Sequence, residues 1–517
     1  MEKQFNQPQS YWLMTAADDT YPKLEHSLDT EVLIVGGGIT GITCAYMLAN
    51  RGIKPIVIEA KTICCGTTGK TTGKVTIQHG PIYSILDEKY GRENAKLYAE
   101  SQKEAVDFVK RIAAQESIDC QLRENTAYLY ASMESDLPAI EKEYNIAAAI
   151  GIDCRYIDKP DFPNHNFGML AFSGQAVFHP VRYVRALAKQ ALSLGAEIFC
   201  ETKAIKVKNG DPILVQCENG IEIRAKHLVM ATQYPIYDGP NLFFTRLYAK
   251  RSYGIAVKKD ASAKNDWPDG SYINVSGRTR SIRTHIENGD RVLIVVGENH
   301  PTGRSDVNMD ERYVSLRDFA DSVAGVDNVL AYWSAQDYDT PDMIPYIGRI
   351  SKNAQIYTAS GYKKWGLSTG TLAGLMLPEL IESGACRYEA LYSRDRSDYT
   401  SSAAKAIIEV GQSVVELIKS KLEKTESLKD LKPGEGRIIR FEGKKAGIYR
   451  DESDRVIILD ISCTHMSTEL NYNAAEKTWD CPAHGGRYSL DGKLLEGPPK
   501  NPLKILYQGM FSDLTNA

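Results

Sequence analysis

Two short motifs of cysteine and histidine near the C-terminus have the residue types of a redox metal site. The first is Cys463-Thr-His465, the second is Cys481-Pro-Ala-His484, and fifteen residues separate His465 from Cys481. In one class of 2Fe-2S cluster, two thiolates hold one iron and two imidazoles hold the other. Each motif supplies one ligand of each kind. The spacing therefore predicts a cluster held between two facing loops, and hence a protein that carries electrons singly.

Zinc is the alternative occupant of a site with two cysteines and two histidines. Structural zinc sites favour a CxxC pair, or two histidines roughly three to five residues apart. The CxH and CxxH motifs match neither spacing. The motifs therefore favour iron and sulfide over zinc.

The residues around these motifs resemble the Rieske domain family. The similar stretches are residues 431–436, 456–460 and 492–499, which flank the two motifs. The resemblance implies a small β-sandwich Rieske domain over residues 433–517, with its 2Fe-2S cluster held by the four motif residues.

Three positions depart from the family pattern. Respiratory Rieske proteins join their ligand loops by a disulfide from the positions that here hold Thr468 and Ala483, and Gly486 replaces a serine that often donates to a bridging sulfide. Tyr488, two residues later, is kept. Fewer donors stabilise the reduced cluster less, so we expect a midpoint potential in the lower half of the roughly −150 to +300 mV Rieske window.

A second motif, near the N-terminus, predicts a dinucleotide site. The apolar stretch 31–35 has the length of a strand, and Gly36, Gly38 and Gly41 open a helix that reaches about residue 50. A second strand over 55–58 ends in Glu59. These glycines permit a tight turn, close approach of a pyrophosphate and close helix packing, while an acid at this distance binds the ribose hydroxyls.

Further stretches resemble the FAD-dependent D-amino-acid oxidase superfamily, which includes glycine and sarcosine oxidases. They are residues 65–74, 176–180, 339–348 and 356–366, within a match over about residues 28–390. The resemblance implies α/β architecture: a Rossmann-type FAD-binding domain with an interleaved antiparallel-sheet substrate domain, over residues 1–395. It also implies FAD contacts from two further segments, at Thr67, Thr68, Gly69, Gly73, Gly361 and Gly366.

We expect the FAD to be non-covalent. Some sarcosine oxidases link flavin to a cysteine shortly before the Thr-Pro-Asp segment, but residues 332–338 contain none. The vicinal pair Cys64-Cys65 lies in the loop that passes close to flavin in this superfamily. We interpret it as small buried residues, because neighbouring cysteines bridge only through a strained ring.

The catalytic residue is not evident from the sequence. Candidates are His79 and His179, whose segments tend to approach flavin in this superfamily, and Lys364, a cation that could contact substrate, phosphate or solvent. For either histidine the alternative is a structural role. The basic residue that often clamps a carboxylate just past Gly366 is absent, which places a carboxylate substrate in doubt. The remaining cations near the motifs are Lys70, Lys74, Lys363 and Arg349.

The composition is consistent with an enzyme of two modules, and it shows no charge pattern typical of proteins that bind nucleic acid or membranes. The chain has 517 residues, 43% hydrophobic content and a net charge of −4. No apolar run approaches the length of a membrane span, and the first residues lack a signal-peptide core, so we expect a cytoplasmic protein. Between the two redox modules, residues 396–432 predict a linker that contains an amphipathic helix over 401–422.

Together these features predict an enzyme, an oxidoreductase that joins a two-electron to a one-electron carrier. The leading hypothesis is hydride transfer from a small amine or related substrate to FAD, then single-electron transfer through the cluster to an external acceptor protein. Electrons entering through the cluster, and a non-catalytic redox partner protein, remain alternatives. No second glycine motif follows a strand, and no closely spaced histidine pair remains for a mononuclear iron, which disfavours pyridine-nucleotide reductases and Rieske oxygenases.

Overall fold

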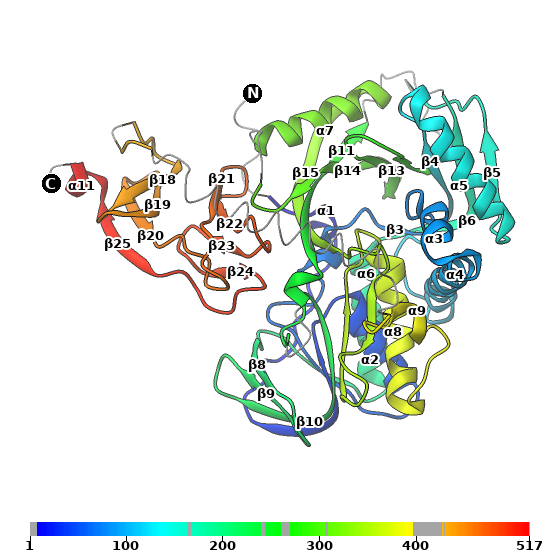
Figure 1. Ribbon diagram of the computed structural model, residues 1–517, viewed down its shortest axis with the longest axis horizontal. Coiled ribbons are helices and arrows are strands. Elements are labelled where there is room, and N and C mark those ends of the chain that lie inside the picture. Colours follow the sequence, from blue (N-terminus) through cyan, green and yellow to red (C-terminus); the bar gives the residue numbers. More distant parts are fainter. Residues whose placement is uncertain are drawn as a thin grey trace. The chain divides into compact units, whose positions relative to one another are not determined.

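The computed structural model describes residues 8–163, 167–238, 243–259, 269–304, 309–396, 426–428 and 430–515. The chain forms two compact units (Figure 1). The first contains Met1–Tyr237, Ser252–Asn299 and Tyr313–Asp398, and the second contains Asp238–Arg251, His300–Arg312 and Tyr399–Ala517. The helix expected over 401–422 lies outside the described residues.

One sheet of the first unit is built around parallel strands. Its order is β16-β17-β10-β1-β2-β7, and the hairpin β8-β9 pairs with β10. The last four residues of β1, Val32 to Val35, are at most 5% exposed, as expected for a parallel strand covered on both faces. The bounds are β1 (Leu28–Val35), β2 (Ile56–Ile58), β7 (Glu197–Phe199), β8 (Ala204–Lys208), β9 (Ile213–Cys217), β10 (Glu222–Gln233), β16 (Tyr346–Arg349) and β17 (Ile356–Ser360).

Helix α2 is the central helix of this layer. It spans Ile39–Ala49 and packs against α6 (Pro180–Ser193) and α8 (Gly366–Ser383) (Figure 1). Ten of its eleven residues are buried. The helix is therefore apolar on all sides because it lies between neighbouring helices and the sheet.

The second sheet is mostly antiparallel and draws its strands from separate stretches of chain. Its order is β15-β11-β14-β13-β12-β4-β6-β3, with β5 on β6. The pair β4–β12 is parallel, whereas the pairs β12–β13, β13–β14, β3–β6, β4–β6 and β5–β6 are antiparallel. The bounds are β3 (Lys74–Val75), β4 (Arg123–Tyr130), β5 (Cys154–Ile157), β6 (Met169–Val177), β11 (Tyr248–Lys259), β12 (Ser271–Asn274), β13 (Arg280–Glu287), β14 (Asp290–Pro301) and β15 (Val326–Asp339).

Shorter and outer helices complete the elements before residue 400. Helix α4 packs on α3 and α8, and α3 packs on α5. The bounds are α1 (Tyr11–Met14), η1 (Thr67–Lys70), α3 (Ile82–Tyr90), α4 (Arg92–Gln115), η2 (Glu134–Asp136), α5 (Leu137–Ala149), η4 (Phe243–Thr245), α7 (Met309–Ala324) and α9 (Glu389–Tyr392). Among the helices described, none combines the length and the apolar character needed to cross a bilayer.

The C-terminal stretch forms two four-stranded antiparallel sheets, β18-β19-β20-β25 and β21-β22-β23-β24. Trp479, Tyr488 and Leu459 belong to one buried core, and Ile439, Ile448 and others to a second. The predicted fold class, α/β followed by a small β domain, is confirmed. The bounds are β18 (Gly436–Phe441), β19 (Lys444–Arg450), β20 (Arg455–Leu459), β21 (Asn471–Asn473), β22 (Thr478–Asp480), β23 (Arg487–Ser489), β24 (Leu494–Glu496), β25 (Ile505–Met510) and α11 (Phe511–Thr515).

Candidate cofactor sites

The turn between β1 and α2 has no room for side chains. Gly36 has φ +115°, and a Cβ there would overlap the carbonyl group of Ala231. A Cβ on Gly41 would overlap the carbonyl oxygen of Gly36. Gly38 precedes the first residue of α2 and provides no side-chain cap. The helix N-terminus, with its positive dipole end, is therefore presented by bare backbone, as pyrophosphate binding requires.

Glu59 and Thr68 both contact this turn. Gly37 N donates to Glu59 Oε2 at 2.8 Å, and Ile39 N donates to Thr68 Oγ1 at 3.1 Å. Glu59 directly follows β2, so its carboxylate lies beside the glycine turn. The residues present fit the adenosine and pyrophosphate parts of FAD.

The two other predicted FAD segments also come together in the first unit. Thr67 Oγ1 donates to the carbonyl of Gln336 at 3.2 Å, in β15. Gly361 adopts φ +78°, Gly366 begins α8, and Tyr362 between them shares a 2.8 Å hydrogen bond with Thr40 in the first turn of α2. This bond fixes the start of α8 next to the start of α2.

A buried lysine lies among aromatic and hydroxyl side chains near the start of α8. Lys74 Nζ donates to Ser281 Oγ at 2.7 Å and lies 5.6 Å from the centre of the Trp365 ring. Strands β6, β4 and β12 separate β3 from β13, so the sheet curves enough for Lys74 to reach Ser281. Lys74 is 8% exposed, and among the described residues no carboxylate forms an ion pair with it. Burial, assisted by Arg283, lowers the pKa of Lys74 to about 7.

Both ring nitrogens of His79 have protein partners. Nδ1 lies 2.7 Å from Tyr98 Oη, and Nε2 lies 2.8 Å from the carbonyl of Thr76 and 2.9 Å from Ser368 Oγ. The ring stacks on Trp365 at 4.7 Å. Burial lowers the pKa of His79 to about 3, so the ring is neutral and held in place. This geometry favours a structural role.

His179 and Lys364 have different surroundings. His179 caps α6, where Nδ1 accepts from Arg182 N at 3.3 Å and Nε2 lies 3.0 Å from Thr15 Oγ1. Burial lowers the pKa of His179 to about 3. Lys364 is exposed and has φ +72°. Among the three candidates, the histidines have the contacts of structural residues.

The other cations proposed from the sequence are dispersed. Lys363 Nζ contacts the sulfur of Met343 at 3.0 Å, and Lys70 is the last residue of η1. Arg349 donates to Tyr357 Oη and to the carbonyl of Leu380, near the far end of α8. Of this set, Lys74 is the buried lysine with a lowered pKa.

Sequence reasoning missed two buried charged groups near these segments. Arg283, 2% exposed, donates to the carbonyls of Thr72, Thr284 and Phe178. Asp337 accepts from Tyr338 N at 2.8 Å, and burial raises its pKa to about 6. Neither lies in a recognisable motif, and Arg283 does not stand out in the sequence because most residues of β13 are polar.

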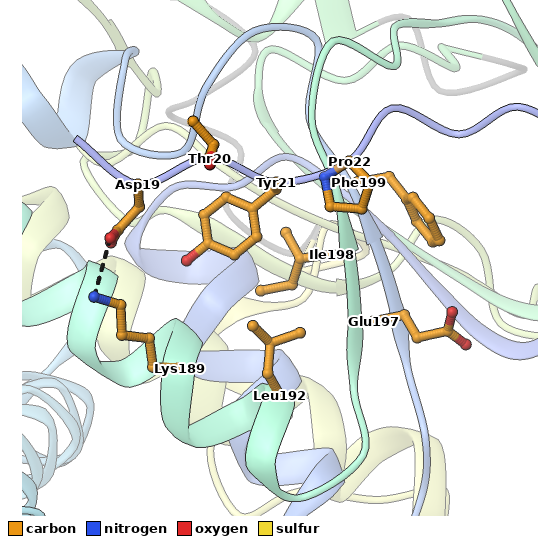
Figure 2. A pocket seen from close by; sticks show the side chains of 9 residues that line it. All are labelled: Asp19, Thr20, Tyr21, Pro22, Lys189, Leu192, Glu197, Ile198 and Phe199. Carbon is orange, nitrogen blue, oxygen red and sulfur yellow. Dashed lines mark ion pairs between the residues drawn. The ribbon is translucent and has the colours of Figure 1, made fainter.

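The cavity shown in Figure 2 does not include the motif residues. Its volume is about 390 Å³, and it lies between the segment 19–22, the end of α6 and the edge strand β7. Tyr21, Leu192 and Ile198 contribute an apolar lining, while Asp19 and Lys189 form an ion pair of 3.0 Å. It contains no group suited to redox chemistry.

The four predicted iron ligands lie on two loops of the second unit. Cys463 and His465 follow β20, while Cys481 and His484 connect β22 to β23. The two thiols lie within hydrogen-bonding distance, and the imidazole rings are 5.0 Å apart at 84°. None of the ten cysteines, including Cys64 and Cys65, forms a disulfide.

This arrangement fits a binuclear cluster. Among the described residues, no three His, Cys, Asp or Glu side chains are arranged to hold one ion. A Rieske cluster does not need such a group, because each iron takes only two protein ligands. Tyr488 Oη lies 3.6 Å from Cys463 Sγ and accepts from Thr464 N at 3.1 Å. It is therefore placed to donate to a cluster sulfur.

A buried ionic network lies next to the second ligand loop. Arg487 contacts Asp480 and Glu476 at 3.0 Å and Glu496 at 3.1 Å. Arg251, from β11, pairs with the same Glu476 and Glu496. These ion pairs connect β22 and β23, the strands that flank the loop, to each other and to β11.

Two family models match the chain. The model of FAD dependent oxidoreductases, DAO, matches residues 31–380, and the Rieske [2Fe-2S] domain model matches residues 423–507. Together they cover both redox modules predicted from the sequence.

Similar proteins include relatives of both modules. A "putative Rieske 2Fe-2S iron-sulfur protein YhfW" of Bacillus subtilis is 36% identical, over 96% of this chain and 97% of the relative. A gamma-glutamylputrescine oxidoreductase of Escherichia coli is 22% identical, over 72% of this chain and 88% of the relative. The structure of glycine oxidase from Geobacillus kaustophilus aligns with a TM-score of 0.58 and 19% identity, covering 71% of this chain and 99% of that one.

Proposed function

The chain belongs to the family of FAD-dependent oxidoreductases and carries a Rieske domain, and from this premise we propose that it oxidises a small amine at a CH–NH bond. Electrons then pass through the 2Fe-2S cluster to an external one-electron acceptor. FAD and the Rieske cluster are the cofactors of these two domain families.

The proposed reaction balances as a two-electron oxidation. Conversion of a CH–NH unit to C=N removes a hydride from carbon and a proton from nitrogen. FAD, when bound, accepts the hydride, and a 2Fe-2S cluster carries one electron at a time. Each substrate molecule therefore requires two one-electron transfers to the acceptor.

The observation that supports this proposal most strongly is the presence of both modules in one chain. The relative that matches 96% of the chain is also described as a Rieske protein. The amine substrate is supported by a relative described as acting on gamma-glutamylputrescine. An amine that loses hydride must first be neutral, because a protonated nitrogen has no lone pair to stabilise the product.

Lys74 suits this requirement. It comes from the strand that follows the glycine-threonine loop, and the charged group that further lowers its pKa is a cation, Arg283. A buried ammonium group there repels a protonated amine, whereas a neutral lysine can accept its proton. We infer that Lys74 selects the neutral form of the substrate.

Anaerobic mixing with a series of amines and N-methylated compounds tests the proposal. A substrate is expected to bleach flavin absorbance first and cluster absorbance afterwards. In Cys463→Ser, which removes an iron ligand, flavin bleaching should persist without the second phase. If excess substrate reduced the flavin of the wild-type protein while its cluster stayed oxidised, electron transfer between the two would be ruled out.

Two alternatives give different results in the same experiment. With electrons entering through the cluster, a one-electron donor would reduce the flavin and amines would not. For a non-catalytic partner protein, no amine would cause turnover. Rapid bleaching by NADH or NADPH alone would indicate a pyridine-nucleotide-linked reductase. We place the reaction in the cytoplasm, which suits a chain whose ten cysteines form no disulfide.

A further inference from the structure

A tight turn at the end of β14 belongs to the same compact unit as the Rieske strands. It comprises residues 300–304 and is called here the 300–304 turn. Arg304 N donates to the carbonyl of Pro301 at 3.2 Å, and His300 Nδ1 lies 2.8 Å from the carbonyl oxygen of Arg304. Thr302 N donates to the carbonyl of Ala249 in β11 at 3.1 Å. The turn is therefore held by its own bonds and by the neighbouring strand.

This turn contacts the second ligand loop through backbone and guanidinium. Gly303 has φ +71°, and a Cβ there would lie 2.6 Å from the carbonyl carbon of Cys481 and from the nitrogen of Pro482. Arg304 Nε donates to the carbonyl of Pro482 at 3.0 Å. Gly303 therefore packs against the Cys481–Pro482 peptide, and Arg304 donates to the next carbonyl, that of Pro482.

The turn also contacts the strand that leaves the first ligand loop. Asn471 Nδ2, at the start of β21, donates to the carbonyl of Gly303 at 2.8 Å. Asn471 pairs in the sheet with Asp480, the residue before Cys481. The 300–304 turn therefore contacts residues next to both ligand loops.

The second ligand loop also has hydrogen bonds of its own. Cys481 N donates to the carbonyl of Gly486, and Gly485 N donates to the carbonyl of Cys481. Pro482 has no N–H to donate, and no disulfide joins the two ligand loops.

We propose that the 300–304 turn is a brace for the second ligand loop, and that Gly303 and Arg304 are positioning residues for the Rieske cluster. The inference rests on the four-ligand assignment made above. By this account a segment that precedes Cys481 by more than a hundred residues of sequence completes the Rieske module. Arg304 also places a positive charge beside the ligand loop, which favours the more negative, reduced cluster.

Gly303→Ala in the full-length holoprotein tests the steric part of the brace. The added methyl group must displace the Cys481–Pro482 peptide, so release of iron to a chelator is expected to be roughly tenfold faster. Gly443→Ala is the matched control, because Gly443 lies in the same unit with φ +79° and nothing within 4 Å of its Cβ. Wild-type iron release in Gly303→Ala, or equally fast release in Gly443→Ala, would overturn the proposal.

Substitutions of Arg304 test the polar part and remain informative if Gly303→Ala does not fold. Arg304→Gln should speed iron release and lower the midpoint potential. Arg304→Lys should also speed iron release, but its midpoint potential should stay close to that of the wild type. FAD content should be unchanged in both. If Arg304→Gln matched the wild type in both measurements, the proposal would be refuted. Retention of the cluster by Cys481→Ser would instead refute the ligand assignment on which it rests.

Discussion

Lys74 should make the stability of the protein depend on pH in a way that one substitution removes. Its pKa in the folded protein is lowered to about 7 from the ordinary lysine value of 10.5, first by burial and then by Arg283. Between these two values the unfolded chain binds a proton that the folded chain does not. The free energy of unfolding therefore rises with pH across this window, by about 1.4 kcal/mol per pH unit.

Lys74→Met removes this dependence and keeps the volume of the side chain. Between pH 7.5 and 9.5 the wild type should gain about 3 kcal/mol relative to the variant. Loss of the hydrogen bond to Ser281 adds a destabilisation of about 1 kcal/mol that does not vary with pH. The variant is thus expected to be more stable than the wild type near pH 7.5, and the advantage should vanish as the pH approaches 10.

Thermal unfolding, followed by the fluorescence of released flavin, measures the effect. An entropy of unfolding of about 2 cal/mol/K per residue gives a domain of this size about 1.5 °C per kcal/mol, hence a relative shift of about 4 °C between the two pH values. Lys89→Met, a substitution near the end of α3, serves as the control for loss of a lysine. A difference between Lys74→Met and wild type that is constant from pH 7.5 to 9.5 would show that Lys74 stays charged, and would refute the reasoning.

Three further outcomes follow from the geometry. Gly41→Ala should abolish FAD binding, measured by flavin absorbance, because its Cβ overlaps the carbonyl of Gly36, whereas Gly52→Ala, with open space around its Cβ, should retain FAD. Tyr488→Phe should lower the midpoint potential in an EPR-monitored titration, because it removes a hydroxyl 3.6 Å from Cys463 Sγ; an unchanged potential would contradict this role. Wild-type protein should titrate in the lower half of the roughly −150 to +300 mV Rieske window, and a midpoint potential above about +150 mV would contradict this.

The sequence by itself determined both cofactor families and the general fold. The spacing of Cys463, His465, Cys481 and His484 identified a Rieske domain, and Gly36 in its strand-turn-helix context identified a dinucleotide site. Both inferences succeeded because the ligands of each motif lie within one or two short stretches. The local backbone then fixes most of the geometry, and spacing along the chain is enough to recognise it.

Only the tertiary structure decided which residues support those motifs. Lys74 is buried beside Ser281 because a sheet curves across three intervening strands, and Arg304 meets Pro482 because β14 ends beside a loop far along the chain. The candidate histidines show the same limit. Whether His79 is free to act depends on partners from other elements, including Tyr98 and Ser368. Such contacts depend on how strands and helices pack, which residue spacing does not encode.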